Sequence, residues 1–104
     1  MAVDYEAVTT AARQYADVVR RAMPVDKIVL FGSYAKKTAN RQSDVDICVF
    51  LPTFGERRRA DIIGDLLKLT HESSAFIEPI AFPTSEIERG NPFVNEVLSN
   101  GIEI

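Results

Sequence analysis

Residues 44–51 constrain this chain most strongly, because two carboxylates open an otherwise apolar run. Side chains alternate between the two faces of a strand, so Asp44 and Asp46 point the same way. Two carboxylates on one face repel each other unless a positive charge lies between them, and a divalent metal ion commonly supplies that charge. The pattern therefore predicts a strand whose first residues form a metal site.

The same run predicts how the strand is divided between core and site. One face carries only aliphatic side chains: Val45, Ile47, Val49 and Leu51. The other face continues from the two aspartates into Cys48 and Phe50. We therefore expect a strand that is open at its entrance and covered at its exit, with Cys48 as a small buried apolar residue rather than a nucleophile.

A second apolar run, residues 27–31, predicts a central strand that is buried on both faces. It ends in Gly32 and Ser33, at the start of a short helix expected over residues 33–39. Glycine allows a close approach between backbone and ligand, and the free N–H groups at a helix start favour a phosphate. A phosphate cradle and metal carboxylates are thus expected on one short connection.

Two longer helices are expected from apolar residues that recur at spacings of three and four. The first spans residues 4–22, with Asp4 able to cap its start, and either packs on the core or presents its tyrosines to a partner. The second spans about 56–71. Its three arginines, residues 57–59, oppose the helix dipole, so they are expected either as solvated side chains or as contacts to phosphates or an acidic partner.

Glu78 is the only charge in a third expected strand, residues 75–82. A carboxylate among apolar side chains is costly to bury without a partner. Glu78 is therefore either a third member of the metal site or an exposed side chain at a sheet edge, which the following proline favours. A C-terminal helix ended by Gly101 is expected next. The apolar tail, residues 102–104, packs either on this chain or on another.

Composition limits the remaining possibilities. With 104 residues, the chain is expected to form one domain, residues 1–104, with a limited core. A formal charge of -3 gives no general nucleic-acid footprint, so direct nucleic-acid binding is not expected. A single cysteine excludes an internal disulfide, and no apolar run approaches the ~20 residues that span a bilayer. We expect a cytoplasmic protein with no membrane partner.

The arrangement of Gly32-Ser33, ten further residues and Asp44-Val45-Asp46 resembles the signature of the nucleotidyltransferase fold of the polymerase-beta superfamily. More narrowly, the short chain resembles the minimal nucleotidyltransferases that act as antitoxins beside HEPN-domain toxins. The resemblance covers roughly residues 23–104. It implies an α/β (α+β) fold, with a small mixed sheet of three to four strands packed by helices.

The resemblance also implies a site in which two Mg²⁺ ions and ATP are bound. Three carboxylates would be both metal ligands and catalytic residues: Asp44, Asp46 and Glu78. Five residues would bind the nucleotide phosphates, two through the turn and three as candidate cations: Gly32, Ser33, Lys36, Lys37 and Arg41. Aspartate is commoner in the family at the position of Glu78. The family also usually reads Gly-Ser-x-Ala-Arg-Gly, whereas here Lys37 occupies the usual glycine position.

The activity that the resemblance implies is transfer of AMP from ATP to a hydroxyl, often of a tyrosine, on a HEPN toxin. Little chain remains to form a large acceptor pocket, which fits an acceptor that brings its own binding surface. Two other functions stay open. The chain could neutralise the toxin by occlusion, with an inactive metal site, or it could modify a small molecule or tRNA with the help of a second domain or subunit.

Overall fold

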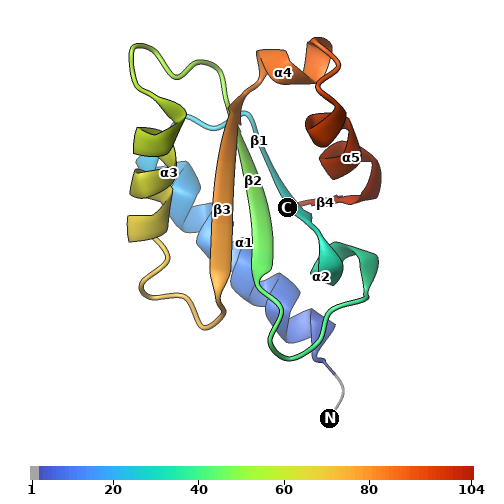
Figure 1. The fold of residues 1–104 in the computed structure, drawn as a ribbon. Helices are drawn as coiled ribbons and strands as arrows, with labels where there is room; N and C mark the ends of the chain where they lie inside the picture. The colour runs from blue at the N-terminus through green and yellow to red at the C-terminus, as the bar shows by residue number, and fades with distance from the viewer. Residues whose placement is uncertain (1–2) are drawn as a thin grey trace.

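The computed structural model describes residues 3–104, so positions 1 and 2 of the expected domain lie outside the described residues. Figure 1 shows one sheet with helices on both of its faces. The elements are α1 (Tyr5–Ala22), β1 (Lys27–Phe31), α2 (Ser33–Lys36), β2 (Val45–Leu51), α3 (Arg59–Lys68), β3 (Ile77–Pro83), α4 (Ser85–Glu88), α5 (Pro92–Asn100) and β4 (Ile102–Glu103). Within residues 3–104, no helix is both long and apolar enough to cross a bilayer.

The four strands lie in the order β3-β2-β1-β4. Strands β2 and β3 are parallel, whereas β1 is antiparallel to both of its neighbours. A parallel pair needs a crossover connection, which α3 supplies between β2 and β3. The expected mixed sheet with packed helices is therefore confirmed.

Strand β2 divides its side chains between two apolar clusters, as its alternation predicts. The aliphatic face, Val45, Ile47, Val49 and Leu51, joins the larger cluster with side chains from α1 and α3. The opposite face places Cys48 and Phe50 in a second cluster with side chains from α5. Cys48 is fully buried, and burial raises the pKa of its thiol to about 12, which fits the prediction of an inert apolar residue.

Helix α1 packs on the core. Its start is capped by Asp4, whose carboxylate accepts a hydrogen bond from the Ala7 backbone N–H at 3.0 Å. Tyr15 is buried, and its hydroxyl donates to the backbone carbonyl of Leu66 in α3 at 2.7 Å. Burial of this phenol raises its pKa. Tyr15 therefore packs within this chain and is not available to a partner, as expected if the first helix packs on the core.

Helix α3 is shorter than predicted at both ends, starting at Arg59 rather than near residue 56 and ending at Lys68. A turn precedes it, and Asp61 accepts a hydrogen bond from the Arg58 backbone N–H at 3.3 Å. The arginines find partners within this chain. Arg57 donates to Asp65 at 2.7 Å, and the Arg59 guanidinium lies 4.0 Å from the centre of the Phe82 ring.

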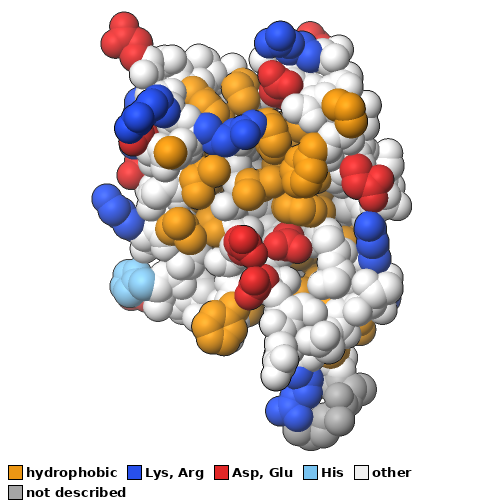
Figure 2. Space-filling view, in the orientation of Figure 1, with side chains coloured by type: hydrophobic (Ala, Val, Ile, Leu, Met, Phe, Trp, Pro, Cys, Tyr) orange, Lys and Arg blue, Asp and Glu red, His pale blue; other side chains and the backbone are white. Residues whose placement is uncertain are grey.

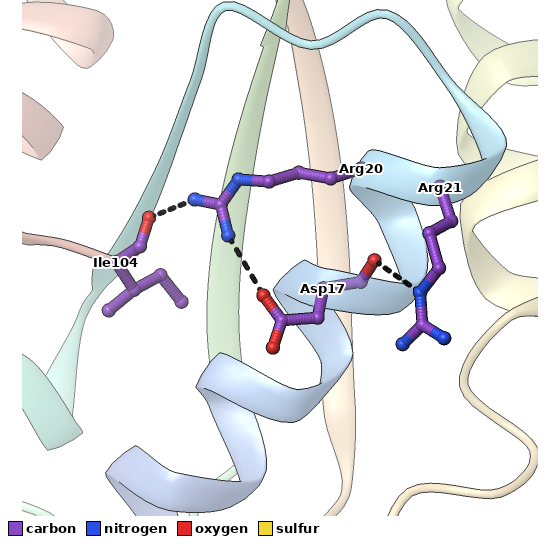
Figure 3. A network of polar contacts seen from close by, with 4 residues as sticks. All are labelled: Asp17, Arg20, Arg21 and Ile104. Carbon is purple, nitrogen blue, oxygen red and sulfur yellow. Dashed lines mark hydrogen bonds and ion pairs between the residues drawn. The ribbon is translucent and has the colours of Figure 1, made fainter.

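The C-terminal tail packs on this chain. Strand β4 pairs with β1, and the Ile104 backbone N–H donates to the Ile28 carbonyl at 2.9 Å. Figure 3 shows the link from this tail to α1, where Arg20 donates to the Ile104 carbonyl and also contacts Asp17. The same residue Asp17 accepts a hydrogen bond from Arg21 through its backbone carbonyl. The tail was expected to pack either on this chain or on another chain, and in the structure it packs on this chain.

Helix α2 ends earlier than the predicted residue 39, because Lys37 adopts the left-handed conformation, with φ 61° and ψ 35°. The Thr38 backbone N–H then donates to the Ser33 carbonyl at 2.9 Å and closes the turn. Left-handed backbone costs a residue with a β-carbon roughly 1–2 kcal/mol, a cost that glycine avoids. The lysine ammonium lies 5.8 Å from the centre of the Tyr5 ring, a cation–π contact worth about 0.5–1 kcal/mol at an exposed site.

We predict that Lys37→Gly is more stable than Lys37→Ala by about 1 kcal/mol, which in a chain of this size raises Tm by about 4–8 °C. Both variants lose the charge and the contact with Tyr5, so their difference reports the backbone alone. Calorimetric melting of the pair at neutral pH measures it. Equal melting temperatures would mean that position 37 is not left-handed in solution.

Candidate functional site

An open cleft lies where β2 begins, with a volume of about 500 Å³. It is lined by polar and acidic residues only: Ser33, Asn40, Gln42, Ser43, Asp44, Asp46 and Glu78. We call this the acidic cleft. Figure 2 shows acidic side chains gathered in the middle of this face, beside a larger apolar area. The start of α2, the connection that follows it, and strands β2 and β3 thus bring together residues that are up to 45 positions apart in the sequence.

Strand pairing positions the acidic cleft. Asp46 lies opposite Phe31 of β1 on one side and opposite Glu78 of β3 on the other. Gly32 directly follows Phe31, so the turn that leads into α2 begins beside Asp46. The order across the sheet is therefore the Gly32 turn, then Asp46, then Glu78.

Gly32 is required by this geometry. Its φ is 75°, a value that favours glycine, and a β-carbon at this position would collide with the Asp46 carboxylate. The backbone of the turn therefore lies directly against Asp46, and Ser33 follows it into the cleft.

Three cleft residues, Asn40, Gln42 and Ser43, were not identified from the sequence. They belong to a turn held by its own side chains. The Asn40 backbone N–H donates to the Ser43 hydroxyl at 3.0 Å, and the Asn40 side chain accepts from the Gln42 N–H at 2.8 Å. Asparagine and serine commonly form such turns, so their spacing was the available signal.

The negative charges in the acidic cleft act on Asp46. The pKa of Asp46 is raised from an ordinary value of 3.8 to about 6, first by burial and then by the charges of Glu78 and Asp44. Asp46 is half-buried, whereas the other two carboxylates are exposed. An ionised Asp46 is therefore unfavourable unless a cation compensates for it.

The donor set fits a hard cation such as Mg²⁺, because carboxylate and hydroxyl oxygens are its preferred protein ligands. The distances between the carboxylates fit a bound ion less well than their chemistry does. Among residues 3–104, no group of three or more histidine, cysteine, aspartate or glutamate side chains is gathered closely enough to hold an ion. Asp44 and Glu78 are exposed, and repulsion between like charges opposes their close approach to Asp46 when no cation is bound. Their role as ligands stays a prediction.

The three cations predicted at the phosphates do not line the acidic cleft. Lys36 pairs with Glu96 of α5 at 3.2 Å, and Lys37 lies over the Tyr5 ring. Arg41 is exposed on the turn that follows. The reason is local, because α2 has only four residues and its last side chain points towards α5 rather than towards β2.

We predict that Asp46→Asn stabilises the metal-free protein near pH 7.5. A carboxyl whose pKa is higher in the folded chain holds its proton more tightly there, so stability falls as pH rises from about 3.8 to about 6. Solvent screening of this half-exposed group leaves a gain on the order of 1 kcal/mol for the amide variant. Below about pH 4 the two proteins should have similar stabilities.

Denaturant unfolding in EDTA at pH 4 and at pH 7.5 tests this prediction. Glu88→Gln, at an exposed carboxylate on α4 that does not line the acidic cleft, serves as the control. A wild type that is as stable as Asp46→Asn at pH 7.5 would show that charge repulsion does not destabilise the cleft.

Comparison with known proteins places the chain in a family. Residues 12–102 match the family model described as "Nucleotidyltransferase domain". A protein of Methanocaldococcus jannaschii named "Putative protein adenylyltransferase" is 29% identical over 83 residues, which cover 77% of this chain and 79% of the relative.

A solved structure agrees at the level of the fold. This chain matches the crystal structure of a protein from Sulfolobus solfataricus that is named a "putative nucleotidyltransferase". The TM-score is 0.70 and the sequence identity is 18%. The match covers 94% of this chain and 82% of that chain. Because the family model matches most of the chain, including strands β1, β2 and β3 and the whole acidic cleft, this chain belongs to the nucleotidyltransferase domain family.

Proposed function

We propose that this chain transfers AMP from ATP to a hydroxyl, that of a tyrosine, on a partner HEPN-domain toxin and so acts as its antitoxin. Family membership supports a nucleotide substrate, and the name of the M. jannaschii relative supports a protein acceptor. One observation carries the proposal. The Gly32 turn and Glu78 flank Asp46 on opposite sides, which separates a phosphate side of the cleft from an acceptor side.

On the phosphate side, the Gly32 backbone and the Ser33 hydroxyl would bind the ATP phosphates. The first N–H groups of a helix have no partner within the helix, so the start of α2 offers donors to an anion. Asp44, Asp46 and Glu78 would hold two Mg²⁺ ions, which when bound neutralise charge on the triphosphate and on the attacking and leaving oxygens.

On the acceptor side, Glu78 would orient the hydroxyl and take its proton. The hydroxyl oxygen forms a bond to the α-phosphorus of ATP while the bond from that phosphorus to the oxygen bridging to the β-phosphate breaks. Pyrophosphate leaves, and the acceptor carries AMP through a phosphodiester bond. Glu78 is exposed at the cleft, so a side chain of a folded partner can reach it.

The charge of the cleft supports a protein acceptor over RNA. Its lining contains three carboxylates and neither lysine nor arginine. An RNA chain gains affinity from a series of cationic side chains that displace its counterions, and the described residues that line this cleft provide no such series.

A second candidate is a binding module that neutralises the toxin by occlusion without transferring a nucleotide. Two observations favour it. The carboxylates of residues 3–104 are not gathered into a ready-made ion site, and Lys36 is paired with Glu96 rather than aimed at the cleft. Catalysis and occlusion differ in their dependence on Asp46.

We predict that Asp44→Asn and Asp46→Asn each lower AMP transfer to the co-expressed HEPN-domain partner by about 10²-fold or more, because each removes several kcal/mol of transition-state stabilisation. Intact-mass spectrometry of the partner measures the addition of AMP. Glu78→Gln should also lose transfer. Glu88→Gln, at another exposed glutamate, should keep it.

Toxicity of the partner in growing cells is the second readout. In the proposed reaction, the aspartate variants fold but no longer protect the cells. A partner that stays unmodified and is fully neutralised by both aspartate variants would establish the binding module instead.

A further inference from the structure

An apolar stripe flanks Glu78 along the open edge of the sheet. Residues two apart on a strand share a face, so Phe76, Glu78, Ile80 and Phe82 follow one another about 7 Å apart. Phe76 precedes β3, yet its carbonyl accepts a hydrogen bond from the Val45 backbone N–H at 2.7 Å and continues the strand pairing. The candidate acceptor carboxylate thus has an apolar side chain on each side.

Phe76 is exposed to an unusual degree. Its side chain is 85% exposed, whereas the next most exposed large apolar residue among residues 3–104 is Leu67 at 49%. A phenylalanine in this position contributes almost nothing to the core of the chain. Large exposed apolar side chains beside a polar site are typical of surfaces that bind another molecule.

A trough of about 450 Å³ continues the stripe beyond Ile80. It is lined by residues of α3, β3 and the start of α5: Arg59, Ile63, Ile80, Ala81, Phe82, Asn91 and Phe93. Phe93 is 47% exposed and packs on Phe31 and Phe82, so its ring is held in place while one side stays open. Figure 2 shows apolar side chains next to the acidic group on this same face.

The stripe and the trough lie on the acceptor side of the acidic cleft. Strand β3 is separated from the Gly32 turn by β2, so a molecule placed on Phe76 and Ile80 does not occupy the phosphate side. Phe93, at the far wall of the trough, also packs on Phe31 of β1 and so borders both sides. The neighbouring residue Pro79 has no backbone N–H, which removes one donor for a further strand at this edge. A strand added at this edge would therefore form an incomplete set of backbone hydrogen bonds.

We infer that Phe76, Ile80 and Phe93, which we call the acceptor face, dock a protein segment whose target hydroxyl has apolar side chains on both sides of it. This inference rests on the proposed transfer to a protein acceptor. The charge of this surface favours a protein over a nucleic acid as the bound molecule. Among residues 3–104, Arg59 is the one cationic residue that lines the trough; its guanidinium lies over the Phe82 ring, and the adjoining cleft is acidic. A neutral apolar segment of a protein fits this surface, whereas a nucleic acid does not.

The test compares Phe76→Ser with the wild type, using the HEPN-domain partner as the probe. Isothermal titration measures the Kd for the partner, and initial rates of AMP transfer give KM and kcat. We expect Phe76→Ser to raise both Kd and KM about tenfold or more, because an interface anchor is lost, and to leave kcat within about twofold. Melting temperature and the affinity for ATP with Mg²⁺ should not change, because Phe76 touches neither the core nor the phosphate side.

Two further variants sharpen the result. Phe93→Ser should act in the same direction, with some loss of stability because its ring packs on Phe31. Val18→Ser removes an exposed apolar side chain from α1 and should leave Kd and KM unchanged.

An unchanged Kd and KM in Phe76→Ser would overturn the acceptor face, even if the partner is labelled and the proposed function holds. If no AMP is transferred, the proposed function fails and the target hydroxyl is removed from this inference. Weaker binding by Phe76→Ser would then support only the docking of an apolar partner segment on this face. Labelling of an RNA oligonucleotide in preference to the partner would overturn the acceptor face as well.

Discussion

Strand β2 is paired on both sides, and its register determines at once what is buried and what is available for chemistry. Pairing of Asp46 with Phe31 and with Glu78 brings the Gly32 turn and the β3 carboxylate to one place. A slip by one residue would turn every β2 side chain to the opposite face. Asp46 would then enter the larger cluster beneath α1, and aliphatic side chains would open into the cleft. The packing of Val45 and Ile47 therefore also fixes the site.

The cleft gains its chemistry at a cost in stability that the core has to offset. Asp46 is half-buried beside like charges, and Gly32 has no alternative because a side chain would collide with that carboxylate. A few residues further along the same face, Phe50 is fully buried and stacks on Phe82. The strand is thus held firmly at its covered end, which allows its open end to carry repelling groups.

Much of this arrangement could be predicted from short-range patterns. The Asp4 cap, the two faces of β2 and the placement of both aspartates at one cleft follow from helical and strand periodicity. Glu78 was identified as a lone charge in an apolar run and by family resemblance, and strand pairing brings it opposite Asp46.

The features that could not be predicted depend on contacts between distant segments or on weak local preferences. Lys36 turns towards Glu96, a residue 60 positions later that no periodicity connects with it. The pairing of β4 with β1 involves two residues, too few for an alternation to show. The turn at Asn40 is held by hydrogen bonds between side chain and backbone. In the sequence, such a turn is indicated only by the presence of asparagine and serine.

The position of Lys36 does not prevent it from contacting a nucleotide. Its ion pair with Glu96 is about half exposed on both sides, and pairs of this kind contribute about 0–1 kcal/mol. A charge-assisted hydrogen bond to a phosphate is stronger than such a pair. The side chain can therefore leave Glu96 at little cost when a triphosphate is present, whereas Asp46 cannot move without disturbing β2. The fixed part of the cleft is thus its negative charge, and the positive charge that a nucleotide requires comes from mobile groups and bound ions.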